Sequence, residues 1–306
     1  MQNFASLFEQ ADRLQPRVPV AVAGGDDTTV IEALAETTRR GWTQPLLCGD
    51  CPSMQRTADQ CGVDHSLFQW VEADRPASTA VALIKESRAA MLMKGQIATP
   101  DLMRAVLDSQ SGLRTGATIG QIVLMEIPKD DRCFLLTDTG INLRPSTEQL
   151  FEMISGAATI SQSIGCRSPH VAMMAASEKE NQAMPETLLA SMLQEMKSTY
   201  SHNTSQTGQV DFTLHGPTSF DLAYSKTAIQ RKRLTDERFH VADVMVFPNL
   251  LSANLTVKAI MYTAECSFGG TLFGAACPIV FMSRADDVAT RIRSIAFALS
   301  QVTCSA

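Results

Sequence analysis

The stretch PVAVAGGDDTTVIEALAETTRRG, residues 19–41, decides the fold class that we predict for this chain. It begins with a short apolar run ending in Gly24-Gly25, as a buried strand that enters a turn would. Asp27 then stands where it can cap a helix, apolar residues repeat at helical spacing, and Gly41 follows the last turn. This stretch therefore predicts one strand–turn–helix unit.

The same alternation of strand and helix continues outward from that unit. We expect a helix over 78–93, two strands over 121–127 and 133–138 that form a hairpin or lie side by side, and a long helix capped by Ser146. Later strands are expected at 170–176, 211–216, 243–249 and 277–282, and later helices at 185–198, 220–231, 254–266 and 286–302. Such alternation predicts an α/β fold with helices covering a mostly parallel sheet.

Length and composition limit the classes of protein that this chain can represent. At about 150 residues per domain, 306 residues suggest two domains. The net charge of −6 argues against a nucleic-acid partner, which needs a basic surface. The first residues lack the pattern of a signal peptide, and no apolar run is long enough for a membrane span. We therefore expect a cytoplasmic protein without a membrane partner.

Eight cysteines are spread along the chain, and we expect free thiols. Cys48, Cys51, Cys61 and His65 have a spacing that zinc could use. Cys48, however, ends an apolar stretch, which favours a small buried side chain over a metal ligand. We predict no metal site, and whether this cluster binds anything else stays open.

The most informative polar residues follow predicted strands, where sheet enzymes bind ligands. Ser283-Arg284 comes directly after the strand 277–282 and precedes a helix led by Asp286-Asp287. A hydroxyl, a guanidinium and a carboxylate at a helix start can form an anion site with a base nearby. The alternative is that Ser283 caps the helix and the aspartates interact favourably with its dipole.

Three further segments carry candidate binding residues, each with a simple structural alternative. Glycines flank Arg114 and Thr115 in SGLRTG, which is otherwise a surface turn. Asn254 and Lys258 follow the strand 243–249, where Asn254 could instead cap a helix. Asp138 and Asn142 lie in TDTGINLRP, after the strand 133–138. Phosphate-loop, nucleophile-elbow and H-E-x-x-H motifs are absent from the sequence.

Seven segments in order along the chain carry a resemblance to a known family. They are LMKGQIATPDLMRAVLD (92–108), SGLRTG (111–116), DTGINLRPSTEQ (138–149), VAMMAASEKENQAMPET (171–187), HGPTSFD (215–221), DVMVFPNLLSANLTVKA (243–259) and CPIVFMSRADD (277–287). Together they resemble the phosphate acetyl/butyryltransferase family, and particularly its shorter phosphate butyryltransferase branch, from about Val20 to the C-terminus.

The resemblance implies a fold and a domain division. The implied fold is a two-domain, three-layer αβα structure like the isocitrate/isopropylmalate dehydrogenases, with an active-site cleft between the domains. Domain I would comprise residues 1–138 and 271–306, and domain II residues 139–270. The family is usually homodimeric, so we also expect a homodimer.

The resemblance also implies a reaction and its residues. The family transfers an acyl group between coenzyme A and inorganic phosphate by way of an acyl phosphate, so coenzyme A would be a substrate and no cofactor would be bound. Ser283 and Arg284 match the family's catalytic pair, and Asp287, with Asp286 as alternate, matches its catalytic aspartate, which would act as the base. His215 stands where acetyl members often have an aspartate, and the loop after Gly116 also differs from the family pattern.

We expect direct attack of the coenzyme A thiolate on the acyl phosphate. Arg114 and Lys258 would bind phosphates, and Thr115, Asn254, Asp138 and Asn142 would contribute to substrate binding. Butyryl is the favoured acyl group, and an acetyl-specific enzyme is the alternative. A nicotinamide-dependent decarboxylating dehydrogenase of the same fold and a non-catalytic acyl-CoA-binding relative are less favoured.

Overall fold

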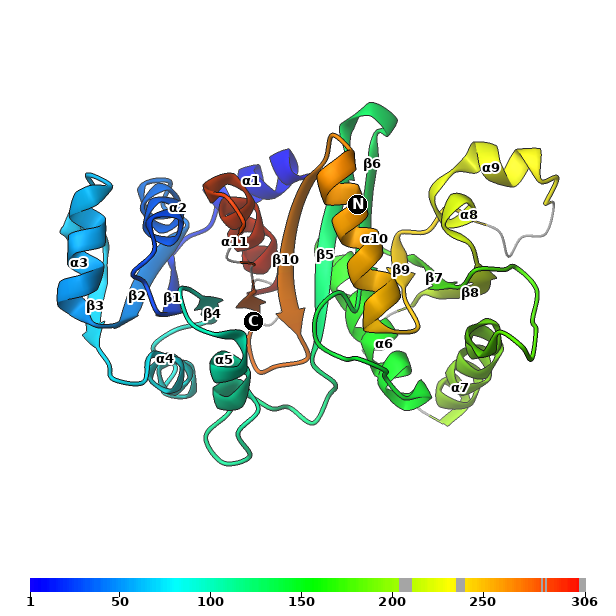
Figure 1. The fold of residues 1–306 in the computed structure, drawn as a ribbon, viewed down its shortest axis with the longest axis horizontal. Coiled ribbons are helices and arrows are strands. Elements are labelled where there is room, and N and C mark those ends of the chain that lie inside the picture. Colours follow the sequence, from blue (N-terminus) through cyan, green and yellow to red (C-terminus); the bar gives the residue numbers. More distant parts are fainter. Residues whose placement is uncertain (204–210, 235–239, 282, 284, 303–306) are drawn as a thin grey trace. The chain divides into compact units, whose positions relative to one another are not determined.

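The computed structural model describes residues 1–203, 211–234, 240–281, 283 and 285–302 (Figure 1). The chain forms two compact units. The first, called the flanking unit here, comprises Asn3–Ala117 and Phe268–Ala306. The second, called the central unit, comprises Met1–Gln2 and Thr118–Ser267. The two units are described separately below.

The flanking unit is a sheet with helices on both faces. Its elements are α1 (Phe4–Asp12), β1 (Val18–Ala23), α2 (Thr28–Arg39), β2 (Thr43–Gly49), α3 (Cys51–Gln60), β3 (Gln69–Glu72), α4 (Pro76–Lys85), β4 (Met91–Lys94), α5 (Thr99–Val106), β10 (Ser267–Phe273), β11 (Ile279–Val280) and α11 (Val288–Val302). The strand order is β3-β2-β1-β4-β11-β10, and the pairs are parallel except β10 with β11. Figure 1 shows α1, α2, α3 and α11 on one face and α4 and α5 on the other.

The first strand–turn–helix unit forms as the sequence predicts. The β1 residues from Val20 to Ala23 are fully buried, as expected of a strand covered on both faces. Asp27 caps α2, because its Oδ1 accepts a hydrogen bond from the Val30 backbone N–H at 3.1 Å. A Cβ atom at Gly95 would lie 1.7 Å from the Gly24 carbonyl oxygen, so only glycine allows the ends of β1 and β4 to approach this closely.

The helix predicted over 78–93 is wrong in its second half. Helix α4 ends at Lys85, and Met91–Lys94 forms the buried strand β4 between β1 and β11. The apolar run of this segment is buried on both sides. A short run of that kind has no strand periodicity that would distinguish it from a buried helix.

The described part of the central unit contains five further strands and five α-helices. Its elements are β5 (Gly120–Ile127), β6 (Arg132–Thr137), α6 (Thr147–Ser163), β7 (His170–Met174), α7 (Leu189–Asn203), β8 (Thr213–Thr218), α8 (Phe220–Tyr224), α9 (Lys226–Arg231), β9 (Val244–Val246) and α10 (Leu250–Thr263). The strand order is β5-β6-β9-β7-β8. Only β5 and β6 are antiparallel, so of the two predicted alternatives they form the hairpin.

Local capping explains where the helices of the central unit begin. Ser146 and Gln149 form the predicted capping box at the start of α6. The single helix expected over 220–231 is divided at Ser225, which separates α8 from α9. Helix α10 begins earlier than expected, because Asn249 rather than Asn254 caps it through the Ser252 N–H at 3.0 Å. In the flanking unit, strand β10 was not predicted.

The observed architecture confirms an α/β fold with mostly parallel strands and covering helices. The predicted division at residues 138 and 270 stays a prediction. Within the described part of the chain, no helix is long and apolar enough to cross a membrane.

Candidate active site

A tight turn joins β11 to α11 and carries the Ser283 and aspartate residues singled out in the sequence. The Ser283 backbone N–H donates to Asp286 Oδ2 at 2.7 Å, and the Ala285 N–H donates to Ser283 Oγ at 3.3 Å. Ser283 is exposed, whereas Asp286 is half-buried. Arg284 lies outside the described residues. The turn therefore sets an accessible hydroxyl next to a partly buried carboxylate.

The two neighbouring aspartates have different surroundings. Asp287 Oδ1 accepts the Thr290 backbone N–H at 2.8 Å, which caps the first turn of α11. This hydrogen bonding lowers the pKa of Asp287. Burial instead raises the pKa of Asp286, although the Ser283 N–H and the charges of Arg291 and Lys94 act in the opposite direction. Asp286 is thus the aspartate with the greater affinity for a proton.

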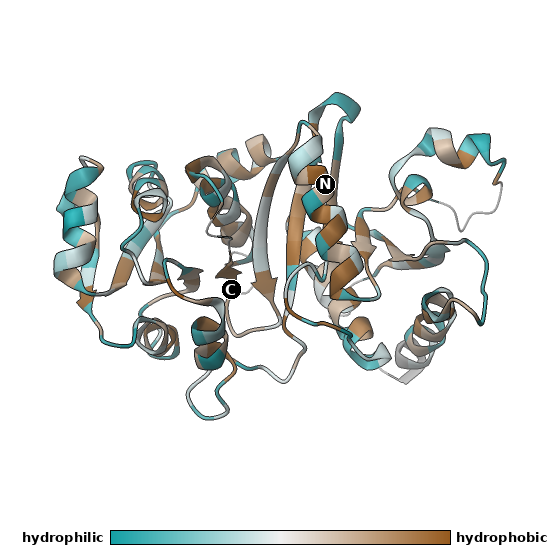
Figure 2. Cartoon of the chain, viewed as in Figure 1, coloured by the Kyte–Doolittle hydropathy of each residue, from teal (hydrophilic) through white to brown (hydrophobic). Residues whose placement is uncertain are grey.

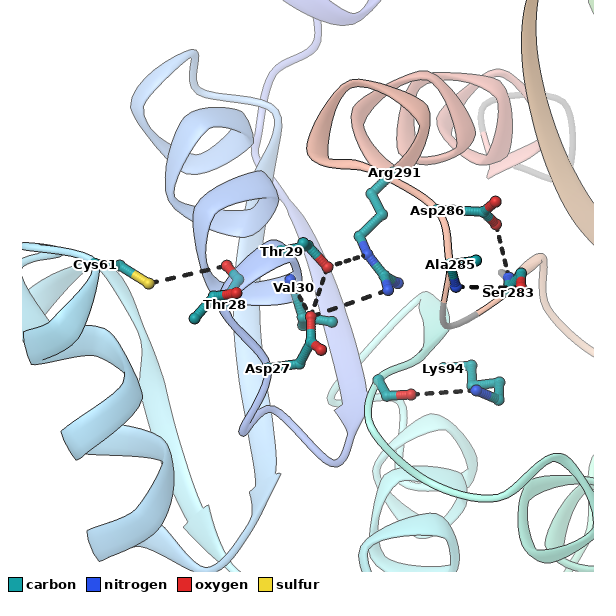
Figure 3. Close-up of polar contacts among 11 residues, drawn as sticks. Asp27, Thr28, Thr29, Val30, Cys61, Lys94, Ser283, Ala285, Asp286 and Arg291 are labelled. Carbon is teal, nitrogen blue, oxygen red and sulfur yellow. Dashed lines mark hydrogen bonds and ion pairs between the residues drawn. The ribbon is translucent and has the colours of Figure 1, made fainter. Parts of the chain in front are cut away.

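Lys94 and Arg291 are two buried cations near this turn that the sequence analysis did not select. Each is only 3% exposed, which is rare for lysine and arginine. Figure 3 shows both side chains together with Ser283 and Asp286. Lys94 ends β4, and Arg291 lies one turn after Asp287 in α11. The signal for Lys94 was a lysine ending an apolar run, but that run was assigned to a helix. The signal for Arg291 was its spacing of four residues from Asp287.

Arg114 and Thr115 belong to the same unit and lie beside the loop between β10 and β11. Arg114 is exposed and its backbone pairs with Ala275. Thr115 Oγ1 donates to the Gly274 carbonyl at 2.7 Å. The turn therefore holds Thr115 against the loop and leaves the guanidinium of Arg114 in solvent.

The other predicted binding residues form a separate cluster in the central unit. Asp138 is 3% exposed, and its carboxylate accepts the backbone N–H groups of Gln121, Gly140, Ile141 and Asn142, together with the Asn142 side-chain amide at 2.6 Å. With its oxygens occupied in this way, Asp138 organises the 138–142 loop.

Helix α10 contacts the same loop. Asn254 Nδ2 donates to the Thr139 carbonyl at 3.1 Å, and Lys258, one turn further along, is exposed. A hollow of about 910 Å³ is lined by Ile141, Asn142, Leu143, Arg144, Gln149, Leu250, Leu251 and Asn254. Asn142 and Asn254 are thus brought together, while Lys258 stands outside the lining.

The cysteine cluster considered as a zinc site lies in surroundings that disfavour the thiolate form of cysteine. Burial raises the pKa of Cys48 to about 12 and that of Cys51 to about 11, and metals bind the thiolate. His65 Nε2 pairs with Asp59 at 2.9 Å. Among the residues that the structure describes, no group of three or more His, Cys, Asp or Glu is placed to hold a metal ion.

His215, which stands where acetyl members often have an aspartate, is buried in β8 with 4% exposure. Burial and the neighbouring His170 and His240 lower its pKa to about 4, so the ring is neutral near pH 7. It is a buried polar residue of the central sheet.

The fold and this strand-to-helix turn define a class of protein: an α/β protein with an exposed hydroxyl and a half-buried carboxylate beyond the end of a parallel strand. Comparison with known sequences gives the family. A family model described as phosphate acetyl/butaryl transferase matches residues 73–299. The chain belongs to this family, which confirms the resemblance found in the sequence.

Individual relatives agree with the family match. A phosphate butyryltransferase from Clostridium acetobutylicum is 34% identical over 91% of both chains. A phosphate acetyltransferase from Thermotoga maritima is 31% identical over 90% of this chain and 92% of that protein. The crystal structure of a branched-chain phosphotransacylase from Enterococcus faecalis V583 is similar with a TM-score of 0.79 and 27% identity, over 93% of this chain and 99% of the other.

Proposed function

We propose that this protein transfers a short-chain acyl group between coenzyme A and inorganic phosphate, with butyryl as the favoured acyl group. The observation that carries the proposal is the 283–287 turn, where an exposed hydroxyl and a half-buried carboxylate share one hydrogen-bonded loop. Relatives named for butyryl and for acetyl transfer match at similar identity, so acetyl specificity is the alternative.

The proposed reaction begins with removal of the proton from the coenzyme A thiol. A free thiol has a pKa of about 8.5 and is mostly protonated at neutral pH, so a positioned base accelerates the step. Asp287 was the first choice from the sequence and Asp286 the alternate. The geometry favours Asp286, because Asp287 caps a helix and its pKa is lowered, whereas burial raises the pKa of Asp286.

The thiolate then attacks the carbonyl carbon of the acyl phosphate. A carbon–sulfur bond forms, and the bond between the carbonyl carbon and the oxygen that bridges it to phosphorus breaks. Inorganic phosphate leaves with the bonding pair. Ser283 Oγ accepts the Ala285 N–H and keeps its own hydrogen to donate to the developing oxyanion. Arg284 is proposed to hold the phosphate by two parallel hydrogen bonds.

The remaining residues have supporting roles in this proposal. Exposed Arg114 and Lys258 bind phosphate groups of coenzyme A or of the acyl phosphate. Thr115 fixes the loop that carries Arg114. Asn254 and Asn142 line the hollow of the central unit, and Asp138 holds that hollow's loop in shape.

We also propose a homodimer, supported by exposed apolar side chains that form a stripe on α10, a helix rich in hydrophobic residues (Figure 2). Leu251 and Leu255 are 69% and 61% exposed, Tyr262 is 80% exposed, and their spacing places all three on one helix face. Large exposed apolar patches mark interaction surfaces, and a twofold dimer would bury this stripe against its own copy. Lys258 lies on the same helix face. It can therefore either contact the partner in the dimer or bind a phosphate group, and the two roles are alternatives.

The isocitrate/isopropylmalate dehydrogenase-like arrangement and the division into 1–138 with 271–306 and 139–270 belong to the same proposal. Two units, each with parallel strands covered by helices, support a division into two domains, although the compact units divide at Ala117–Thr118 and not at 138. A cytoplasmic location is supported by the free thiols of the cysteines that the structure describes, since disulfides are rare in that compartment.

The deciding experiment is a thiol-release assay with acetyl-, propionyl- and butyryl-CoA and phosphate as acceptor. The proposal expects phosphate-dependent release that is fastest with butyryl-CoA, and a preference for acetyl-CoA would support the alternative. Absence of phosphate-dependent release with all three, together with retained binding of acyl-CoA, would identify a non-catalytic relative. Nicotinamide reduction with a 2-hydroxy acid would identify a dehydrogenase.

A further inference from the structure

Two buried positive charges converge on the carboxylate that we propose as the base. Lys94 and Arg291 are each 3% exposed, and they come from different elements, the end of β4 and the first turns of α11. Removing a cation from water costs several kcal/mol unless nearby anions and hydrogen bonds compensate. Arg291 has the Thr29 hydroxyl and the Asp27 carboxylate as partners, and Lys94 donates to the Gly95 carbonyl.

Arg291 is fixed between the start of α2 and the 283–287 turn. Its Nε donates to Thr29 Oγ1 at 2.7 Å, and its Nη2 lies 4.0 Å from Asp27 Oδ1 (Figure 3). Burial lowers the pKa of Arg291, while the charges of Asp27, Asp286 and Asp287 raise it. The guanidinium is therefore held at one place by α2 while its charge acts on Asp286.

Lys94 approaches the turn from the neighbouring strand. Strand β4 pairs with β11 in parallel, with Met93 opposite Val280, so Lys94 lies level with the residue that follows Val280. Its Nζ donates to the Gly95 carbonyl at 3.3 Å. The positive charge of Lys94 lowers the pKa of Asp286. Both cations thus sit on rigid elements on either side of one turn.

The charged groups around Asp286 can be named element by element. Asp287 and the Ser283 N–H come from the turn itself, Arg291 from α11 and Lys94 from β4, and Asp27 stands behind Arg291 at the start of α2. If Asp286 took up a proton, these two cations would lose one of their compensating charges. The two cations therefore favour the carboxylate and oppose burial, which raises the pKa of Asp286.

We propose that Lys94 and Arg291 are positioning residues of acyl transfer, which hold Asp286 ionised and in place as the proton acceptor for the coenzyme A thiol. This inference rests on the proposed function. A base must be ionised before it can take a proton, and a buried base without opposing charges would be protonated over more of the neutral range. Because both cations are fixed by packing, the field is in place before the substrate binds.

The first test is the pH dependence of kcat/KM in Lys94→Gln and Arg291→Gln. Each variant is expected to move the acid limb of the profile upward by about one pH unit, because the carboxylate loses a stabilising charge. Lys85→Gln is the matched control, since Lys85 is exposed on α4 of the same unit and donates to the Gln110 carbonyl. An acid limb that stays in place in both folded variants would overturn the inference.

The second test asks whether the cations act through Asp286. In an Asp286→Asn background, Lys94→Gln is expected to lower kcat by no more than about twofold at every pH, whereas with Asp286 present it lowers kcat by up to about tenfold on the acid limb. Equal losses in the two backgrounds would contradict the inference. Lys94→Arg and Arg291→Lys keep the charge and should leave the acid limb within about 0.3 unit of the wild type, which also covers the case in which a glutamine variant fails to fold.

A third measurement does not depend on activity, so it separates this inference from the proposed function. The difference in melting temperature between the wild type and Asp286→Asn, followed from pH 4 to 8, reports the titration of Asp286 in the folded protein. Its midpoint should move upward in the Lys94→Gln background. If the wild type shows no acyl transfer and the midpoint still moves, the proposed function fails and the inference about Asp286 stands. An unmoved midpoint would overturn the inference alone.

Discussion

The Asp286 carboxylate accepts the backbone N–H of Ser283 at 2.7 Å, so the proposed base and the proposed oxyanion donor are parts of one turn. The Ser283 hydroxyl is exposed in the same turn, and its oxygen already accepts the Ala285 N–H. Movement of either residue displaces the other. This coupling makes the turn a preorganised unit, which is how enzymes stabilise charge that develops in the transition state.

The two aspartates of the turn can be separated by conservative substitution. Asp286→Asn is expected to lower kcat by two to four decades (about 10²- to 10⁴-fold), because it removes the proton acceptor. Asp287→Asn keeps an oxygen that can cap α11, so its activity and melting temperature should stay close to those of the wild type. Steady-state kinetics on both variants, with circular dichroism as a folding control, provide the check. The opposite ranking would restore Asp287 as the base.

Replacement of Ser283 tests the proposed hydrogen bond to the oxyanion. Ser283→Ala is expected to lower kcat by about 10²- to 10³-fold with little change in the Michaelis constants, because the bond strengthens only as charge develops. Ser283→Thr retains a hydroxyl and should recover part of that loss. Activity of Ser283→Ala within threefold of the wild type would remove Ser283 from the transition state.

Arg114 is proposed to bind a phosphate group and not to take part in bond making. Arg114→Ala should therefore raise the Michaelis constant for coenzyme A about tenfold and leave kcat nearly unchanged. Arg104→Ala is a suitable control, because Arg104 is an exposed arginine of the same unit that pairs with Asp101 at 2.9 Å. An unchanged Michaelis constant in Arg114→Ala would place the coenzyme A phosphates elsewhere.

Much of the fold follows from local signals in the sequence. Asp27 and the capping box of Ser146 and Gln149 start their helices as predicted, because capping depends on side chains within one turn. The failure at Met91–Lys94 has a different cause. Whether that run becomes a strand depends on β1 and β11 on either side of it, and those neighbours are not local in the sequence.

The candidate site likewise combines residues that are close in the sequence with residues that only the fold brings together. Ser283, Asp286 and Asp287 are close in the sequence, so all three were candidates before the structure, with Asp287 as the first choice of base and Asp286 as the alternate. Lys94 is almost two hundred residues distant in the chain from Asp286, and only the parallel pairing of β4 with β11 brings its charge to the turn. Asp138 was expected to bind substrate, but its oxygens are occupied by its own loop, a property that residue type cannot reveal.

The apolar stripe on α10 leads to a prediction about assembly. Leu255→Glu should convert a dimer to a monomer, since it places a charge in the centre of a buried face, and light scattering measures the change. Lys258→Ala distinguishes the two roles that compete for this face. A raised Michaelis constant for coenzyme A with an unchanged mass would assign Lys258 to phosphate binding and move the dimer contact away from it.

The buried imidazole of His215 makes the stability of the protein depend on pH. Its pKa in the folded protein is about 4, below the ordinary value of 6.5, because burial disfavours the charged ring. Above pH 6.5 the ring is neutral whether the chain is folded or unfolded, so His215 contributes no pH dependence there. Between pH 6.5 and 4 the unfolded chain binds a proton that the folded protein does not. Stability is therefore lost as the pH falls through this range.

His215→Gln should remove this loss, which amounts to at most about 3 kcal/mol at pH 4. Urea unfolding at pH 7, 6, 5 and 4 measures it as the change in unfolding free energy relative to pH 7. His65→Gln is the control, because the His65 side chain is 40% exposed and lies in the other unit, and the variant should follow the wild type across the same range. If the pH dependence of His215→Gln matches that of the wild type, His215 takes up its proton inside the folded protein and the depressed pKa is wrong.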